Sequence, residues 1–260
     1  AGSDLAVLKT SARLQGEHFL VNGNKLWTSG AESADFIWLA ARTDPDLARH
    51  KGVSILILDT TLPGFSSTVI PTTSNPTAAT YYDNVAVPRD MLVGELNGGW
   101  KLITAQLNHE RLGLGSWSDK VAGLFRRVYL WAKATDEQGR RAMDKAWVRT
   151  SLAECYSRLE AMRLINLRIA ANLEHERMDV ALSSTTKVYG SESAIEILRR
   201  LSAVIGVNGS LRSGSAAAAL HGELEYELRA SVTVTFGGGT NEIQRELIAQ
   251  FGLGMPRTQR

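Results

Sequence analysis

The positions of proline constrain this chain more than any other feature of its sequence. Proline fixes one backbone angle and donates no hydrogen bond, so it is excluded from helix interiors and central strands. After Pro88 no proline occurs until Pro256, and the stretch between them has apolar residues at helical spacing. The other prolines are Pro45, Pro63, Pro71 and Pro76. We therefore expect a β region over residues 1–95 and a helical region over 96–260.

The first region contains short apolar runs of strand length. The clearest are 36–42, 53–59 and 80–87. Asn22 and Gly23 lie between two further runs, Phe19–Val21 and Lys25–Ser29, and Asn-Gly is a strong signal for a two-residue hairpin turn. Short strands at this spacing predict an antiparallel β-barrel or β-sandwich.

Beyond residue 96, apolar residues recur every three or four positions, as on one face of a helix. The pattern predicts helices over 100–114, 147–176, 185–205, around 215–228 and over 241–251. Short connections between such helices favour an up-and-down four-helix bundle. We expect an α+β fold in which a middle β domain, 1–95, precedes a helical bundle domain, 96–260.

The composition excludes several classes of protein. The chain has 260 residues, 44% of them hydrophobic and 22% charged, and its net charge of +2 provides no basic field for nucleic acid. No apolar run approaches the roughly 20 residues of a membrane span. The five histidines lack metal-ligand spacing, so no metal is expected. The single cysteine, Cys155, lies among apolar residues, which predicts a core thiol and fits a cytoplasmic protein.

A carboxylate interrupts the apolar stripe of the first predicted helix. Glu110 falls on the same helical face as Leu107 and Leu114. Burying an unpaired polar group costs roughly 2–7 kcal/mol, so this position needs an explanation. Either Glu110 forms an ion pair with an arginine such as Arg111, or it is a general base whose pKa is tuned by burial. The spacing alone leaves both explanations open.

Trp27, Thr28 and Ser29 form a second candidate group, followed by Gly30. The tryptophan offers a flat apolar face, and the two hydroxyls offer hydrogen bonds at a loop. Such a group suits a planar heteroaromatic ring with a polar edge. A half-buried surface tryptophan beside turn hydroxyls explains the same residues.

Three consecutive glycines, Gly237–Gly239, precede the last predicted helix. Either Thr240 or Asn241 can cap this helix, and Asn241 with Gln244 has the spacing of a capping box. Glycines before a helix start allow the close approach of a cofactor edge, and an ordinary loop and cap explain them as well. The segment is not GxGxxG and lacks a βαβ context, so a Rossmann site is excluded.

Several segments, in this order and spread over the whole chain, resemble those of acyl-CoA dehydrogenases: AGSDL, VNGNKLWTSGAESADFIWLAARTD, YDNVAVP, LVGELNGGWKLI and GGGTNEIQRELIA. The resemblance implies an N-terminal helical domain, a middle β domain and a C-terminal helical bundle. The chain begins inside the motif that opens the β domain, without a signal peptide. We therefore expect that the N-terminal all-α domain is missing from it.

The resemblance implies FAD as the cofactor and α,β-dehydrogenation of an acyl-CoA thioester, in which a glutamate takes the α-proton and flavin N5 takes the β-hydride. The residues implied at the flavin are Ser3, Trp27, Thr28, Ser29, Thr240 and Glu242. Those implied at the acyl-CoA are Arg111 and Gly238. An electron acceptor such as electron-transfer flavoprotein is implied too, as is a homo- or hetero-tetramer of related subunits.

The resemblance also bears on Glu110. Most of the family carries its catalytic glutamate directly before Gly-Thr, where this chain has Gly238. A smaller branch, similar to the isovaleryl- and long-chain acyl enzymes, carries it on the first long bundle helix before an arginine. Glu110 with Arg111 matches that branch, which implies Glu110 as the base. A non-catalytic partner subunit is the alternative, and an oxidase or a non-CoA substrate stays open because fold does not fix function.

Two family segments that contact the FAD of a neighbouring subunit are altered here. In the Gln-x-x-Gly-Gly segment, Ala203 replaces the glutamine and Val207 replaces the second glycine. The family's Arg-x-x-Phe-Gly segment has no Phe-Gly counterpart within residues 135–148. These changes predict a heteromer whose partner supplies the missing contacts. Some actinobacterial family members that act on steroid side-chain CoA esters are similar in this respect.

Overall fold

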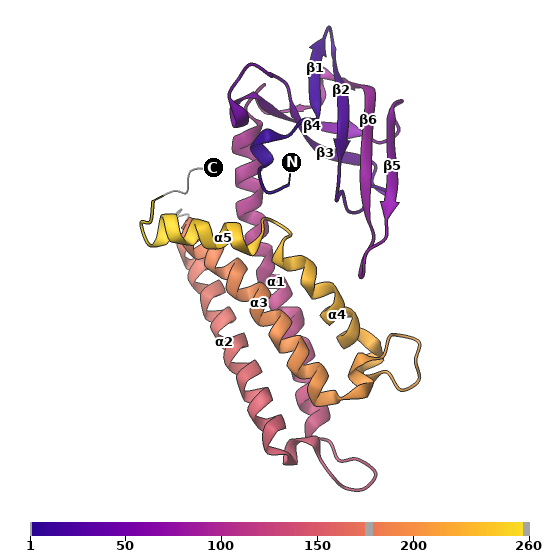
Figure 1. Cartoon of the computed structure of the whole chain (residues 1–260), viewed down its shortest axis with the longest axis vertical. Coiled ribbons are helices and arrows are strands. Elements are labelled where there is room, and N and C mark those ends of the chain that lie inside the picture. Colours follow the sequence, from indigo (N-terminus) through magenta and orange to yellow (C-terminus); the bar gives the residue numbers. More distant parts are fainter. Residues whose placement is uncertain (1, 175–178, 257–260) are drawn as a thin grey trace. The chain divides into compact units, whose positions relative to one another are not determined.

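The structure is a computed structural model that describes residues 2–174 and 179–256, with the backbone alone at 108–117 and 173–174. The chain divides into two compact units, Ala1–Leu107 and Asn108–Arg260, which we name the β unit and the helical unit (Figure 1). Helix α1 (Gly99–Lys133) begins in the β unit and ends in the helical unit. Its first turns belong to the β unit because their apolar side chains pack on the sheet.

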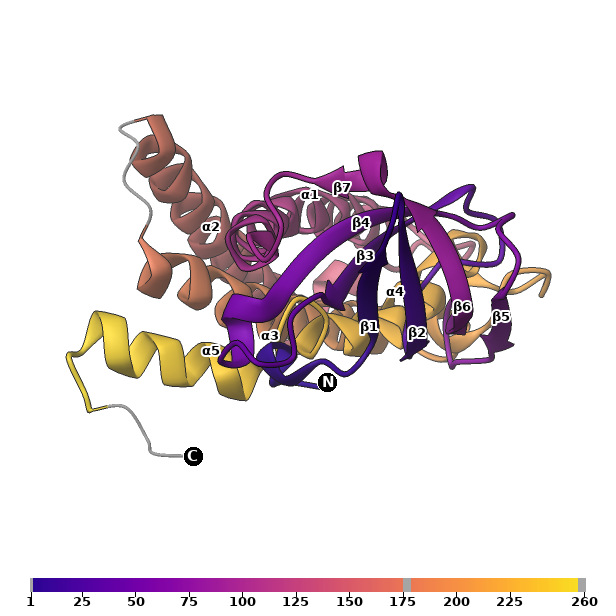
Figure 2. The same ribbon diagram turned by 90° about the horizontal axis from the view of Figure 1, so that it is seen from above.

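The β unit is built on one seven-stranded sheet in the order β5-β6-β2-β1-β3-β4-β7. The strands are β1 (Ser11–Gln15), β2 (His18–Lys25), β3 (Phe36–Arg42), β4 (Val53–Asp59), β5 (Phe65–Ile70), β6 (Thr77–Pro88) and β7 (Leu92–Val93). All neighbours are antiparallel apart from β1 and β3, which form one short parallel contact between Ser11 and Arg42. Figure 2 shows how the strands fan out across the twisted sheet. The expected β region is confirmed.

The hairpin turn expected at Asn22 and Gly23 is wrong. Both residues lie inside β2, whose pairing with β6 shifts register between Val21 and Gly23. Gly23 has a φ of +134°, and a Cβ atom there would lie 2.9 Å from the Cα of Thr10. The glycine therefore marks a β-bulge at a close backbone approach, not a turn. The turn between β1 and β2 lies instead at Gly16.

Strand β4 is covered on both faces, which explains its unbroken apolar run. On one face, Leu56 and Leu58 join the main core of the sheet. On the other face, Val53 and Ile55 pack with Ile103 from the first turns of α1. A strand buried on both sides needs no alternation of polar and apolar residues. The run VSILILD is therefore predicted correctly as a strand, but the helix that covers one of its faces is not predicted.

The helical unit contains the rest of α1, then α2 (Ala146–Glu174), α3 (Val180–Ile205), α4 (Glu223–Ser231) and α5 (Asn241–Leu247), which continues into a π-helical turn (Ile248–Gly252). One apolar core contains side chains from α1, α2, α3 and α4. They include Val121, Leu124, Val128, Leu152, Cys155, Ile197, Leu198, Leu201 and Leu224. Burial raises the pKa of the Cys155 thiol to about 11, as fits a packed core thiol. The predicted bundle is confirmed.

Helix α4 begins later than expected, at Glu223. Leu220 and His221 have positive φ angles of 51° and 56°, which a helix does not allow. Gly222 follows with φ +80°, and a Cβ atom there would lie 2.2 Å from the backbone nitrogen of Ser213. The chain therefore folds tightly against itself just before α4, and this tertiary contact overrides the helical propensity of the preceding alanines.

Lys25, the last residue of β2, is partly buried directly opposite Thr80 of β6. Burial lowers the pKa of its ammonium group from 10.5 to about 8. The charged form is therefore less favourable in the folded chain than in the unfolded chain.

We expect Gly64→Ala to lower the free energy of unfolding by more than about 2 kcal/mol, because left-handed strain and a steric clash add together. Gly64 has a φ of +88°, and a Cβ atom there would lie 2.1 Å from the carbonyl oxygen of Asp83. Gly16→Ala is the matched control, since Gly16 has a φ of +58° with open space around it. Urea denaturation followed by tryptophan fluorescence measures both variants. Equal losses would contradict the clash.

We expect Lys25→Met to stabilise the chain below pH 8, by about 3 kcal/mol at roughly 1.4 kcal/mol for each unit of pKa shift. Between pH 8 and 10.5 the unfolded chain keeps the Lys25 proton that the folded chain has lost, so wild-type stability rises. The advantage of Lys25→Met should shrink over that range. Urea denaturation at a series of pH values measures it, with the exposed Lys9→Met as control. An advantage that does not change with pH would refute the lowered pKa.

Candidate functional site

A loop after β2 presents the indole of Trp27 to solvent. Trp27 has a positive φ of 67°, and 68% of its surface is exposed. A bulky residue seldom adopts this left-handed backbone, and such strain is found preferentially at functional sites. The next residue anchors the loop, because the Thr28 N–H donates to the Ala78 carbonyl oxygen at 2.9 Å. We name residues 27–30 the tryptophan loop.

Two threonines of β6 hold the hydroxyls of the tryptophan loop. Thr28 Oγ1 lies 3.4 Å from Thr80 Oγ1. Ser29 Oγ lies 3.1 Å from Thr77 Oγ1. The Tyr82 hydroxyl extends the first contact, 3.0 Å from Thr80 Oγ1. Each hydroxyl has one hydrogen and two lone pairs, so Thr28 and Ser29 keep hydrogen-bonding capacity for a ligand.

The supporting hydroxyls were not among the residues predicted from the sequence. Thr77 and Thr80 are 48 and 52 positions away from the residues they contact. The alternation of a strand places Thr80 and Tyr82 on one face, but no local pattern pairs them with a loop so distant. Burial raises the pKa of Tyr82, which keeps its hydroxyl protonated.

In the helical unit, Thr240 caps α5. Its Oγ1 accepts a hydrogen bond from the Ile243 N–H at 3.3 Å. The expected capping box of Asn241 and Gln244 is wrong, because the Asn241 amide bonds to α3 instead. Glu242 is exposed, and hydrogen bonds from its own backbone N–H and from the Thr240 hydroxyl lower its pKa. Its carboxylate therefore stays ionised beside the start of the helix.

The glycines before α5 form a left-handed turn. Gly238 and Gly239 have φ angles of 66° and 101°. The side chain of Gln244 occupies the space beside Gly239, since a Cβ atom there would lie 2.7 Å from Gln244 Nε2. Gly239 is favoured by its left-handed backbone, and a larger residue would also displace the end of the Gln244 side chain. At Gly237 a Cβ atom would meet a carbonyl oxygen at 3.4 Å, an ordinary contact. We name residues 237–240 the glycine loop.

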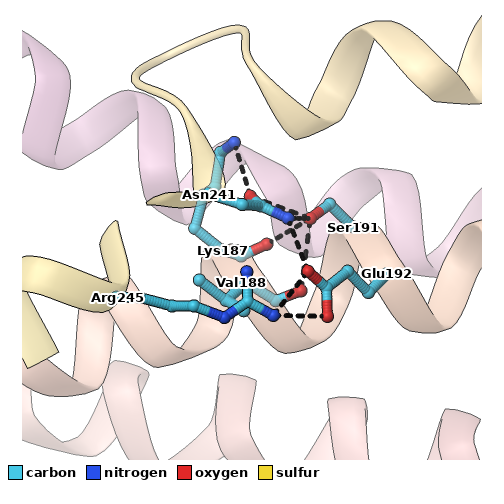
Figure 3. A network of polar contacts seen from close by, with 6 residues as sticks. All are labelled: Lys187, Val188, Ser191, Glu192, Asn241 and Arg245. Atoms are coloured by element: carbon cyan, nitrogen blue, oxygen red, sulfur yellow. Dashed lines mark hydrogen bonds and ion pairs between the residues drawn. The ribbon is translucent and has the colours of Figure 1, made fainter. Parts of the chain in front are cut away.

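A polar network, buried at Lys187, Ser191 and Asn241 and exposed at Glu192 and Arg245, joins the start of α5 to the middle of α3 (Figure 3). Lys187, only 1% exposed, donates from Nζ to Asn241 Oδ1 at 2.9 Å. Asn241 Nδ2 donates to Ser191 Oγ at 3.0 Å and to Glu192 Oε1 at 3.1 Å. Arg245 donates twice to the Glu192 carboxylate, at 2.7 and 2.8 Å. The network therefore crosslinks the residue that follows Thr240 to a long helix.

Sequence reasoning missed this network. Ser184, Lys187 and Ser191 lie three and four positions apart on α3, and all are buried. Polar residues at this spacing form a stripe on one helical face. The stripe was the available signal for a buried polar contact, although it does not name the partner on α5.

The remaining predicted site residues are Ser3, Glu110 and Arg111. Ser3 lies in an exposed turn of the β unit. Glu110 and Arg111 are on the helical backbone of α1, and their side chains lie outside the described residues. The tryptophan loop belongs to the β unit and the glycine loop to the helical unit, so they form two separate candidate groups.

Among the side chains that the structure describes, no cluster of histidine, cysteine, aspartate and glutamate is arranged to hold a metal ion. None of the helices over residues 2–174 and 179–256 combines the length and apolar character needed to cross a bilayer. The two candidate groups offer an indole, hydroxyls, amides and a glycine-rich backbone.

Comparison with known families and structures agrees with both units. Residues 1–85 match the family model "Acyl-CoA dehydrogenase, middle domain", and residues 97–253 match "Acyl-CoA dehydrogenase, C-terminal domain". The chain is 44% identical over 268 residues to acyl-CoA dehydrogenase FadE26 of Mycobacterium tuberculosis (strain ATCC 25618 / H37Rv), covering 100% of this chain and 67% of that protein.

Two solved structures are similar along nearly the whole chain. The "Tcur3481-Tcur3483 steroid ACAD" superposes with a TM-score of 0.94 at 45% identity, covering 99% of this chain and 66% of that chain. The ChsE4-ChsE5 complex from Mycobacterium tuberculosis superposes with a TM-score of 0.90 at 44% identity, covering 99% and 67%. This chain thus spans about two thirds of the length of these relatives. Since both units match and the identity extends over the full length, the chain belongs to the acyl-CoA dehydrogenase family.

Proposed function

We propose that the protein containing this chain is an FAD-dependent enzyme that oxidises the Cα–Cβ bond of an acyl-CoA thioester. The tryptophan loop carries the proposal, since an exposed indole on strained backbone stands beside two hydroxyls anchored on β6. A flat apolar face with hydrogen-bonding groups at its side suits the edge of an isoalloxazine ring.

The described residues fit FAD by their chemistry. Trp27, Thr28 and Ser29 would hold the isoalloxazine ring and its polar edge. Thr240, with the first turn of α5 and Glu242, would meet the remainder of the flavin. FAD, when bound, accepts the β-hydrogen as a hydride. The two left-handed glycines before Thr240 support this assignment, because they let backbone approach a ligand closely.

Glu110 would take the α-proton. That proton is weakly acidic, so its removal needs a positioned carboxylate and a polarised thioester carbonyl. Gly238 stands where most of the family has its base, so a catalytic chain of this kind needs a carboxylate from another position. Ser3 and Arg111 would lie near the thioester and the acyl-CoA, and Gly238 would leave space for the acyl chain.

The alternative is a non-catalytic subunit that supports a related catalytic chain. Gly238 at the usual base position and the changes at Ala203 and Val207 favour it. Glu110 and the complete tryptophan loop favour catalysis, since a subunit without a reaction has no need of a strained indole beside anchored hydroxyls.

We propose further that the protein is a hetero-oligomer with a related subunit. Ala203 is exposed, and 81% of the surface of Val207 is exposed. Arg140 and Arg141 each pair with an aspartate of their own loop. The segments that would reach a neighbour's flavin therefore offer small apolar side chains and arginines engaged within their own loop. Two relatives are named as pairs, the Tcur3481-Tcur3483 protein and the ChsE4-ChsE5 complex.

The substrate, acceptor and location complete the proposal. One relative is named a steroid ACAD, and glycines at 237 and 238 suit a bulky acyl group. Electron-transfer flavoprotein is the expected electron acceptor, by the family resemblance. A cytoplasmic location fits a chain whose one cysteine is a buried free thiol.

We expect Glu110→Gln, in the full-length protein with its partner, to lower acyl-CoA turnover by about 10²–10⁴-fold, the usual contribution of a positioned acid or base. The substitution keeps the shape of the side chain, so FAD content should not change. His109→Gln is the matched control, because adjacent residues on a helix point in different directions. Steady-state kinetics measures both. Unchanged turnover in Glu110→Gln would refute its role and favour the non-catalytic subunit.

A heteromer that lacks contacts from one subunit should hold fewer flavins than subunits. Gel filtration with light scattering gives the assembly, and flavin absorbance gives the FAD content. We expect weak FAD binding by the protein alone and stable binding after co-expression with a related subunit. A homo-oligomer with FAD in every subunit would contradict the hetero-oligomer proposal.

A further inference from the structure

Each end of the Asn241 amide faces hydrogen-bonding partners of complementary polarity. Its Oδ1 accepts from Lys187 Nζ, and its Nδ2 donates to Ser191 Oγ and Glu192 Oε1 (Figure 3). A reversed amide would place a donor against an ammonium group and an acceptor against a carboxylate. The network therefore allows one orientation of this side chain, which fixes the first residue of α5 relative to α3.

The network acts next to the residue proposed to contact the cofactor. Thr240 precedes Asn241 directly, so the position of Asn241 sets that of Thr240 and of the end of the glycine loop. Helix α5 has only 7 residues, and the loop before it contains two left-handed glycines. Neither element is rigid by itself. Helix α3 has 26 residues and is packed in the core, so it provides the fixed reference.

A buried lysine is an energetically unfavourable residue at the contact between two helices. Lys187 is 1% exposed, and burying an ammonium group is unfavourable unless it is paired. Replacing both members of a buried polar pair by apolar residues is often neutral or stabilising. The hydrogen bond from Lys187 Nζ to Asn241 Oδ1, however, fixes the orientation of the Asn241 amide.

We propose that Lys187 is a positioning residue, which acts through Asn241 to hold Thr240 and the glycine loop in the geometry that binds FAD. The inference rests on the proposed function and requires no contact between Lys187 and the cofactor. It assigns a role to a polar network that the chemistry of dehydrogenation does not use directly.

Three variants of the full-length protein in its native assembly test this inference: Lys187→Met, Asn241→Leu and the double variant. Each single variant is expected to weaken FAD binding by about tenfold or more, as for the loss of a hydrogen bond to a charged group. Each should also unfold at a lower temperature, because one buried polar partner is left behind. In the double variant, FAD affinity should stay as low as in Asn241→Leu alone, because both substitutions act on the same contact.

Two measurements separate positioning from a merely structural role. Fluorescence titration gives the FAD dissociation constant, and the visible circular dichroism of bound flavin reports its surroundings, while thermal unfolding is recorded on the apoprotein. Arg199→Met is the matched control, since it removes a cation from an exposed position of the same helix, and FAD affinity should not change. Recovery of FAD affinity together with stability in the double variant would overturn the proposal, as would unchanged affinity in the single variants.

If Lys187→Met does not give folded protein, Ser191→Ala decides the question. It removes only the hydroxyl that accepts from Asn241 Nδ2. We expect FAD binding to weaken several-fold with an altered flavin spectrum, and unchanged binding would overturn the proposal.

A wild-type assembly that binds no FAD would refute the proposed function itself. That result differs from one in which wild type and all variants bind FAD equally, which refutes the positioning role alone.

Discussion

The hydrogen bond from the buried Lys187 to Asn241 joins a short helix and a glycine-rich loop to a long helix in the core of the helical unit. In the β unit, Thr77 and Thr80 of a paired strand hold the hydroxyls of the tryptophan loop in a comparable way. In each unit a segment with unusual backbone, such as the left-handed Trp27, is fixed by side chains from a regular element. Unusual backbone persists only where its surroundings over-determine it.

Polar groups on the packed face of α5 lower the stability of the fold relative to an apolar interface. The amide of Gln244 and the hydroxyl of Ser184 are buried, and neither has a hydrogen-bond partner among the described residues. Such groups are destabilising, yet Gln244 also fills the space beside Gly239 and so supports the left-handed turn. Local rules of packing are most often broken where function sets the geometry. The start of α5 fits that description better than any other segment of the helical unit that the structure describes.

The sequence predicted the elements of this fold better than the contacts between them. Proline positions and apolar spacing identified the β region and the helices α2 and α3 correctly, because these signals are local. The first helix was predicted only over 100–114, whereas α1 ends at Lys133. The turn at Gly23 and the start of α4 were wrong because a close approach from elsewhere, by Thr10 and by Ser213, determines the backbone there. For the site, the family resemblance named Trp27 and Thr240. It could not name their supports, since Thr77 is 48 positions from Ser29 and Lys187 is 54 from Asn241.

In the hetero-oligomer that we propose, burial separates two kinds of position in this chain. Substituting a buried, bonded residue such as Lys187 leaves a polar partner unpaired, so it harms folding and function together. Ala203 and Val207 are exposed, and surface substitutions usually change stability by less than about 0.5 kcal/mol. Nothing in the folding of this chain therefore preserves residues that serve only a neighbour's flavin. If a related subunit supplies those contacts, as we propose, selection on this chain would act only on its own candidate groups, and an asymmetric pair of subunits is the expected result.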